Sequence, residues 1–100
     1  MPDLSAEDAK LVTLARATRA RTRAAEGAAV RDTDGRTYAG ATVSLPSLQL
    51  SAVQVCIAMA ISSGSGGLEA VVVMGADAVA EADEAAIREF GGVGVVVHLV

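Results

Sequence analysis

Residues 69–100 read EAVVVMGADAVAEADEAAIREFGGVGVVVHLV, and this stretch decides the fold. The apolar run Glu69–Met74 predicts a buried strand, and the acidic, alanine-rich segment from about Ala80 to Phe90 predicts a helix. Gly91-Gly92 ends that helix, and the valine-rich segment Val93–Val100 predicts a second strand. Because a strand, a helix and a strand at this spacing form a right-handed crossover, we expect the two strands to pair in parallel.

The segment before residue 50 predicts a helix followed by a β-hairpin. Ser5 is a suitable N-cap, and apolar residues recur on one helix face until about Ala24. The hairpin begins with a strand at Gly27–Arg31 and a turn at Asp32–Gly35, whose Asp-Gly pair favours positive φ. Its second strand is Thr37–Val43, and Leu45–Ser47 breaks that strand.

The segment from about Ser51 to Ile61 is apolar nearly all round, and its length favours a helix. Such a helix must be buried on every side, which in a domain this small implies that another subunit covers one face. We therefore expect a homo-oligomer through Ser51–Ile61. The order of elements predicts the α/β class, with residues 1–100 forming one three-layer α-β-α domain around a mixed sheet of four or five strands.

The chain has one cysteine, Cys56, and one histidine, His98. An intrachain disulfide and a zinc site built from three or four Cys and His ligands are therefore excluded. Cys56 lies in the apolar helix and is interpreted as a buried structural thiol. His98 lies in a predicted strand without an evident partner and is interpreted as a packed or edge residue. The glycine-rich segment 64–67 follows a helix and is interpreted as a connector.

The formal net charge of −4 gives no overall support for nucleic-acid binding. The basic residues are nevertheless concentrated near the N-terminus, with a cluster from Arg16 to Arg23. The simpler interpretation is a solvated helix end, where cations complement the helix dipole. The alternative is contact with phosphate or nucleic acid.

The chain shows no targeting or membrane-spanning segment. Its apolar runs reach only about 10 to 12 residues, and a membrane helix needs roughly 20. The single thiol fits a reducing compartment, so we expect a cytoplasmic protein.

Three segments, 27–30, 34–43 and 87–91, resemble the cytidine deaminase family. Members of that family read Val-Gly-Ala-Ala, then Asp-Gly, an aromatic residue and Thr-Gly in the first hairpin, and Glu-Phe-Gly at a later helix end. The order of elements also agrees, and the resemblance spans about residues 6–100. It implies the family's three-layer fold, with a helix matching Ser51–Ile61 that commonly mediates dimers or tetramers.

The resemblance also places the family's chemical motifs on this chain. Deaminases of this fold bind zinc through a Cys or His of a Cys/His-Ala-Glu motif and two cysteines of Pro-Cys-x-x-Cys, and the Glu transfers protons. The first motif falls on Val53 and Val55, and the second motif places its two ligands at Ala80 and Asp83. The resemblance therefore implies that neither zinc nor another cofactor is bound.

The substrate-contacting motif of the family falls on Thr42 and Ser44, which with Gln54 form the candidate binding cleft. The leading hypothesis is a zinc-free, catalytically inactive member that acts as an oligomeric binding or assembly module. One alternative is a divergent nucleoside deaminase that uses Glu81, Asp83 or His98. A weaker alternative is RNA binding through the basic cluster at residues 16–23.

Overall fold

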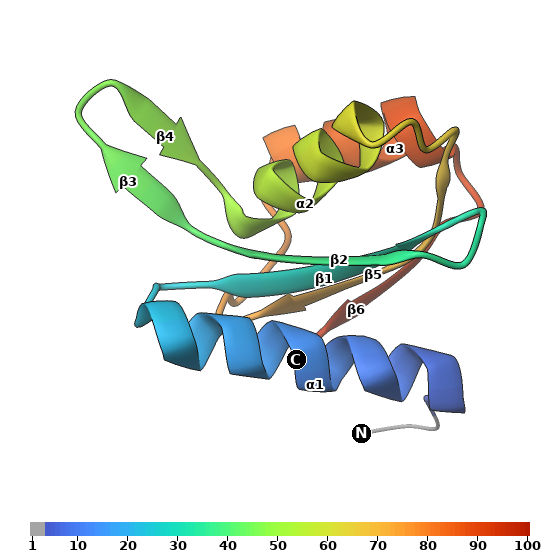
Figure 1. Ribbon diagram of the computed structural model, residues 1–100, viewed down its shortest axis with the longest axis horizontal. Coiled ribbons are helices and arrows are strands. Elements are labelled where there is room, and N and C mark those ends of the chain that lie inside the picture. The colour runs from blue at the N-terminus through green and yellow to red at the C-terminus, as the bar shows by residue number, and fades with distance from the viewer. Residues whose placement is uncertain (1–3) are drawn as a thin grey trace.

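A four-stranded sheet lies between one long helix and a pair of shorter helices in the computed structural model, which describes residues 4–100 (Figure 1). Helix α1 covers one face of the sheet, and α2 and α3 cover the other. The elements in chain order are α1 (Ala6–Thr22), β1 (Gly27–Asp32), β2 (Thr37–Ala41), β3 (Val43–Leu45), β4 (Leu48–Leu50), α2 (Ala52–Ser62), β5 (Leu68–Met74), α3 (Glu81–Gly91) and β6 (Val96–Leu99). The predicted three-layer α/β architecture is confirmed.

The strand order of the main sheet is β2-β1-β5-β6. Strand β1 is antiparallel to both β2 and β5, with Ala29 opposite Ala39 on one side and Val72 on the other. Strands β5 and β6 are parallel, as the strand-helix-strand pattern of residues 69–100 predicts, with Val72 opposite His98. Within residues 4–100 the main sheet is therefore a mixed sheet of four strands.

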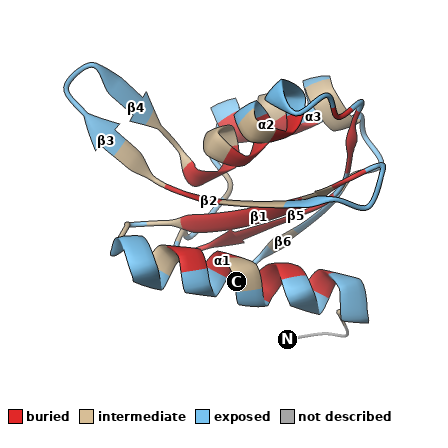
Figure 2. Ribbon diagram, viewed as in Figure 1, coloured by how far each residue is buried: buried red, intermediate tan, exposed pale blue. Residues whose placement is uncertain are grey.

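Small residues in β1 allow the helices to pack closely on both faces of the sheet. Ala28 and Val30 face α2 and α3, whereas Ala29 faces α1, and all three are fully buried. Figure 2 shows most of β1 in the colour of buried residues. A Cβ atom on Gly27 would lie 2.5 Å from the carbonyl oxygen of Ala15 in α1. Glycine at the start of β1 therefore sets the distance between α1 and the sheet.

The break predicted at Leu45–Ser47 is wrong. Strand β2 ends at Ala41, and residues 43–50 form a second hairpin of β3 and β4, which projects from the body of the molecule (Figure 1). Leu45 pairs with Leu48, so Pro46 and Ser47 form the turn. Proline is favoured at the first central position of a turn because its ring fixes φ. The proline therefore connects two strands here instead of ending one.

Two predicted element boundaries also differ from those in the structure. Helix α1 ends at Thr22 instead of Ala24, because Arg23 adopts a left-handed conformation with φ of 54° and its N–H caps the helix. Strand β6 begins at Val96 instead of Val93, because residues 93 and 94 form a turn in which Val93 is 93% exposed. Within residues 4–100, no helix combines the length and the apolar character that crossing a bilayer requires.

Candidate functional site

The N-termini of α2 and α3 meet through a hydrogen bond between Ser51 and Asp83. Ser51 is the N-cap of α2, and its Oγ accepts from the Gln54 amide at 3.0 Å while Gln54 Oε1 accepts from the Ser51 amide at 2.9 Å. The same Ser51 hydroxyl donates to Asp83 Oδ1 at 2.6 Å. Asp83 is only 4% exposed. The carboxylate is thus held by the N-cap of the neighbouring helix.

The four positions on which the resemblance places the family's zinc ligands and proton-transfer residue lie at these two helix starts. Val53 is fully buried in the apolar cluster between the sheet and α2 and α3. Val55 is half-buried and packs over Gly40 of β2, and Ala80 is the N-cap of α3 without a side-chain hydrogen bond. Asp83 is engaged with Ser51, as described above.

This set of side chains does not fit a zinc ion. Zinc in proteins is bound by thiolate, imidazole and carboxylate groups, whereas Val53 and Ala80 carry no donor atom. Asp83 alone supplies a carboxylate, and among residues 4–100 no three His, Cys, Asp or Glu side chains converge to hold a metal. The neighbouring Cys56 is buried at the sheet, and burial raises the pKa of its thiol to about 12, against a hydrogen bond from the Gly40 backbone that lowers it. The predicted burial of Cys56 is confirmed.

A pocket of about 290 Å³ opens beside the start of α2. Two of the predicted cleft residues, Thr42 and Ser44, line it together with Ser51 and Glu26. The Thr42 hydroxyl already makes a hydrogen bond: it accepts from the Glu26 amide at 3.0 Å and so joins the end of β2 to the segment before β1. The third predicted residue, Gln54, uses its side-chain oxygen in the helix cap. Ser51 and Glu26 were not predicted, although the Ser-x-x-Gln pattern at residues 51–54 is the sequence signature of a capping box.

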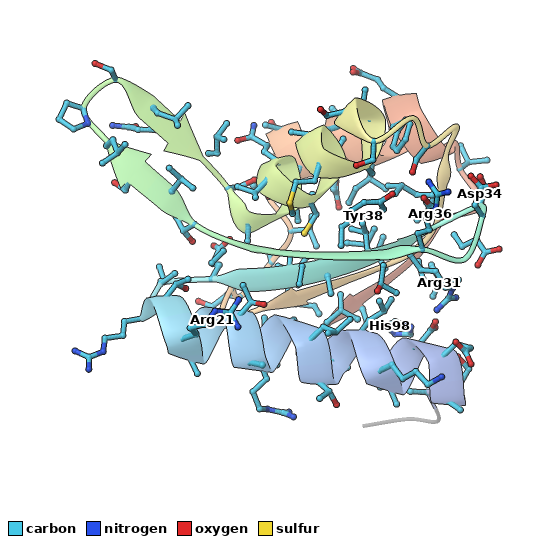
Figure 3. The ribbon with its side chains drawn as sticks, in the orientation of Figure 1. Arg21, Arg31, Asp34, Arg36, Tyr38 and His98 are labelled. Carbon is cyan, nitrogen blue, oxygen red and sulfur yellow. The ribbon has the colours of Figure 1, made fainter. Side chains whose placement is uncertain are left out.

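The three residues that could transfer protons are not brought together. His98 faces α1, where its Nε2 lies 2.8 Å from Asp8 Oδ2 (Figure 3). Asp83 faces the opposite side of the sheet, with α2 and α3, and Glu81 is exposed in the first turn of α3. The prediction that His98 is packed is confirmed, but it does have a partner, Asp8, which lies 90 residues away in the chain.

Asp8 joins α1 to two strands of the sheet. Besides His98 of β6, it pairs with Arg31 of β1, whose Nη2 lies 3.0 Å from Asp8 Oδ1. Arg31 also donates from Nε to Glu69 of β5 at 2.8 Å. The hydrogen bond with His98 lowers the pKa of Asp8, burial opposes this, and Arg31 lowers the pKa further. These contacts are structural, because they fasten the start of α1 to the sheet.

A third buried carboxylate, Asp32, organises the turn between β1 and β2. Its Oδ1 accepts from the amides of Asp34 and Arg36, each at 2.9 Å. Its Oδ2 accepts from the Tyr38 hydroxyl at 3.1 Å and from the Ser65 hydroxyl. Burial by itself raises the pKa of Asp32, but these four hydrogen bonds outweigh it and hold the pKa below its ordinary value. The turn predicted at residues 32–35 is confirmed, with Gly35 at φ 86°.

Comparison with solved structures places this arrangement among known folds. The cytidine deaminase from Mycobacterium leprae is 25% identical with a TM-score of 0.80, and the match covers 95% of this chain and 87% of that chain. The cytidine deaminase from Mycobacterium tuberculosis is 25% identical with a TM-score of 0.81, and the match covers 93% of this chain and 85% of that chain. The cytidine deaminase from Burkholderia pseudomallei, at 23% identity and a TM-score of 0.79 over 94% and 83% of the two chains, shares the fold.

A comparison with curated proteins gives no match. A family model described as cytidine deaminase-like matches residues 4–100. That range includes the sheet, all three helices and both helix starts at which Ser51 and Asp83 meet. The chain therefore belongs to the cytidine deaminase-like family.

Proposed function

We propose that this chain is a zinc-free member of its family that does not deaminate cytidine and acts as an oligomeric binding module. The observation that carries the proposal is the chemistry at the two helix starts. The resemblance assigns two of the metal-ligand positions to Val53 and Ala80, and that of the proton-transfer glutamate to Val55, and none of these side chains can do that chemistry. A zinc deaminase needs both the metal-bound hydroxide and the glutamate, because one attacks the base and the other moves the protons.

The pocket beside α2 is the proposed binding site. Thr42, Ser44 and Ser51 line it with hydroxyl groups, of which those of Thr42 and Ser51 already make hydrogen bonds within the chain, and Glu26 also lines it. Hydroxyl groups both donate and accept hydrogen bonds, so they suit a small polar ligand that carries hydroxyl or amide groups. Gln54 is not included in the proposed binding site, because its side-chain oxygen accepts the hydrogen bond of the helix cap.

The outer face of α2 is the proposed subunit interface. Ile61 is 54% exposed, and Ala58 is also exposed on this helix. A depression of about 430 Å³ lies beside Ala58, which lines it with Tyr38, Met59 and residues 62–63. An exposed apolar patch on a small domain marks an interaction surface, and a second copy that offers the same face would bury it symmetrically.

The lone, buried thiol of Cys56 supports a cytoplasmic location.

Metal analysis together with an activity assay tests the loss of catalysis. The purified chain should contain far less than stoichiometric zinc, and it should release no ammonia from cytidine above a protein-free control. Stoichiometric zinc with cytidine turnover would overturn the proposal. Turnover without zinc that disappears in Asp83→Asn but persists in Glu81→Gln would instead establish the alternative, a divergent deaminase.

Light scattering after gel filtration tests the interface. We expect a mass of at least two chains for the native protein and a monomer for Ile61→Glu, because a carboxylate on the α2 face would be buried without a partner. Val93→Glu is the matched control, since Val93 is 93% exposed on the turn before β6 and lines neither α2 nor the depression beside it. A native monomer would refute the assembly.

A further inference from the structure

Three arginines on one side of α1 line a pocket that the proposed function does not use. Arg16 and Arg19 are three residues apart on one face of α1, and Arg23 follows as the C-cap of the helix. They line a pocket of about 390 Å³, and the buried side chain of Met74 at the end of β5 contributes an apolar wall. Its remaining lining residues are alanines, so no acidic side chain lines it.

Arg19 is the central member of this group, and two glycines make room for it. Unlike the exposed Arg16 and Arg23, Arg19 is half-buried. A Cβ atom on Gly75, which has φ of 96°, would lie 2.8 Å from Cζ and 3.0 Å from Nε of Arg19. A Cβ atom on Gly27 would lie 2.7 Å from the Cβ of Arg19. The guanidinium thus lies against the backbone after β5, and its position is restricted before any ligand arrives.

The three arginines also have no partner of opposite charge in the part of the chain that the structure describes. Arg31 pairs with two carboxylates and Lys10 pairs with one, but no ion pair within residues 4–100 includes Arg16, Arg19 or Arg23. The helix dipole favours Arg19 in the last turn of α1, but it does not account for Arg16, which lies six residues before the end of the helix at Thr22.

We propose that this pocket binds the phosphate group of a small phosphorylated molecule. A guanidinium presents a planar pair of donors that matches two phosphate oxygens, and several guanidinium groups around one pocket can satisfy a doubly charged group. The volume of about 390 Å³ is within the range of small-molecule sites. The net charge of −4 and the small extent of the pocket favour a small ligand over a nucleic acid, which needs an extended basic surface.

Isothermal titration of the full chain with inorganic pyrophosphate at low salt tests the site. Arg19→Gln should weaken binding at least tenfold, and Arg16→Gln and Arg23→Gln should weaken it severalfold. Arg21→Gln is the matched control, because Arg21 is an exposed arginine of the same helix outside the pocket, and it should leave the affinity unchanged. Absence of pyrophosphate binding, or an equal loss in all four variants, would overturn the proposal.

Two further measurements separate the site from a structural role and from RNA binding. Arg19→Lys keeps the charge and loses the planar pair of donors, so we expect it to bind pyrophosphate several times more weakly at an unchanged melting temperature. Equal affinity in Arg19→Lys and the native chain would contradict the proposed geometry. A single-stranded RNA of twelve nucleotides should bind no more tightly than pyrophosphate. Tighter RNA binding that weakens steeply with salt and also depends on Arg21 would replace the proposed site with a nucleic-acid surface.

Discussion

Replacing Asp32 should destabilise the protein more than any other change in the turn between β1 and β2. The Asp32 carboxylate is fully buried and accepts from four donors: two turn amides and the hydroxyls of Tyr38 and Ser65. A hydrogen bond to a charged group contributes about 1.5–3 kcal/mol. The full sum of four overstates the loss, because the amides of exposed Asp34 and Arg36 can bind water instead. The Tyr38 and Ser65 hydroxyls also lie 3.1 Å apart and can bond to each other.

We therefore expect Asp32→Ala to lower the free energy of unfolding by about 3–5 kcal/mol, a large share of the total of a domain this size. Asp32→Asn keeps one acceptor oxygen and should lower it by about 1–2 kcal/mol. Urea denaturation followed by circular dichroism measures both. Asp34→Ala and Asp34→Asn are the controls, since Asp34 is an exposed carboxylate of the same turn, and each should change the value by less than about 0.5 kcal/mol.

The pH dependence provides a second check on Asp32. Because its folded-state pKa is lowered, its carboxylate contributes stability that is fully present above its unfolded pKa of about 3.9. That contribution is lost as the pH falls through the lowered folded value. The difference between the native chain and Asp32→Asn should therefore be constant near neutral pH and shrink below about pH 4. An Asp32→Ala variant as stable as Asp34→Ala, or a difference independent of pH, would refute the role assigned to this network.

Three further changes test other contacts. Asp8→Asn should remove stability that the native chain has above about pH 4 and loses below it, because the pKa of Asp8 is lowered chiefly by its hydrogen bond with His98. Urea denaturation at several pH values measures this, and a difference in unfolding free energy between the two proteins that does not change with pH would contradict it. Gly27→Ala should cost about 1–3 kcal/mol in thermal unfolding, since the added methyl forces α1 away from the sheet, and an unchanged melting temperature would argue against that packing. Ser51→Ala should cost about 1–3 kcal/mol, because it removes the N-cap of α2 and the donor to Asp83; a loss no larger than that of the exposed Ser62→Ala would show that this contact is unimportant.

Hydrophobic periodicity and turn residues were sufficient to predict the order of the main elements. The valine runs of β5 and β6 and the alanine-rich α3 between them predicted the parallel pair. The hairpin of β3 and β4 was missed because Pro46 was interpreted as a break. Its strands have only three residues each, too few to show a period.

The polar contacts of the candidate site could not be predicted in the same way. Ser51 and Asp83 are 32 residues apart in the chain, and each alone is a common residue near a helix start. Periodicity reports which face of an element is buried, but it does not report which side chains of two elements meet. Periodicity also gave no sign of the positions that the resemblance assigns to the family's zinc and proton-transfer residues, which are Val53, Val55, Ala80 and Asp83. The three arginines of the α1 pocket were visible as a cluster, whereas the role of Gly75 beside them was not.

The position of β1 has a consequence for how the molecule opens. This strand is hydrogen-bonded along both edges, to β2 and β5, and covered by helices on both faces, whereas β6 bonds to β5 alone within residues 4–100. Val96 and Val97 of β6 are 48% and 40% exposed. Backbone amides exchange their hydrogens fastest where few buried contacts resist local opening. Amides of residues 28–30 should therefore exchange only when the whole domain unfolds, while those of β6 exchange through fraying of one edge that leaves the centre of the sheet closed.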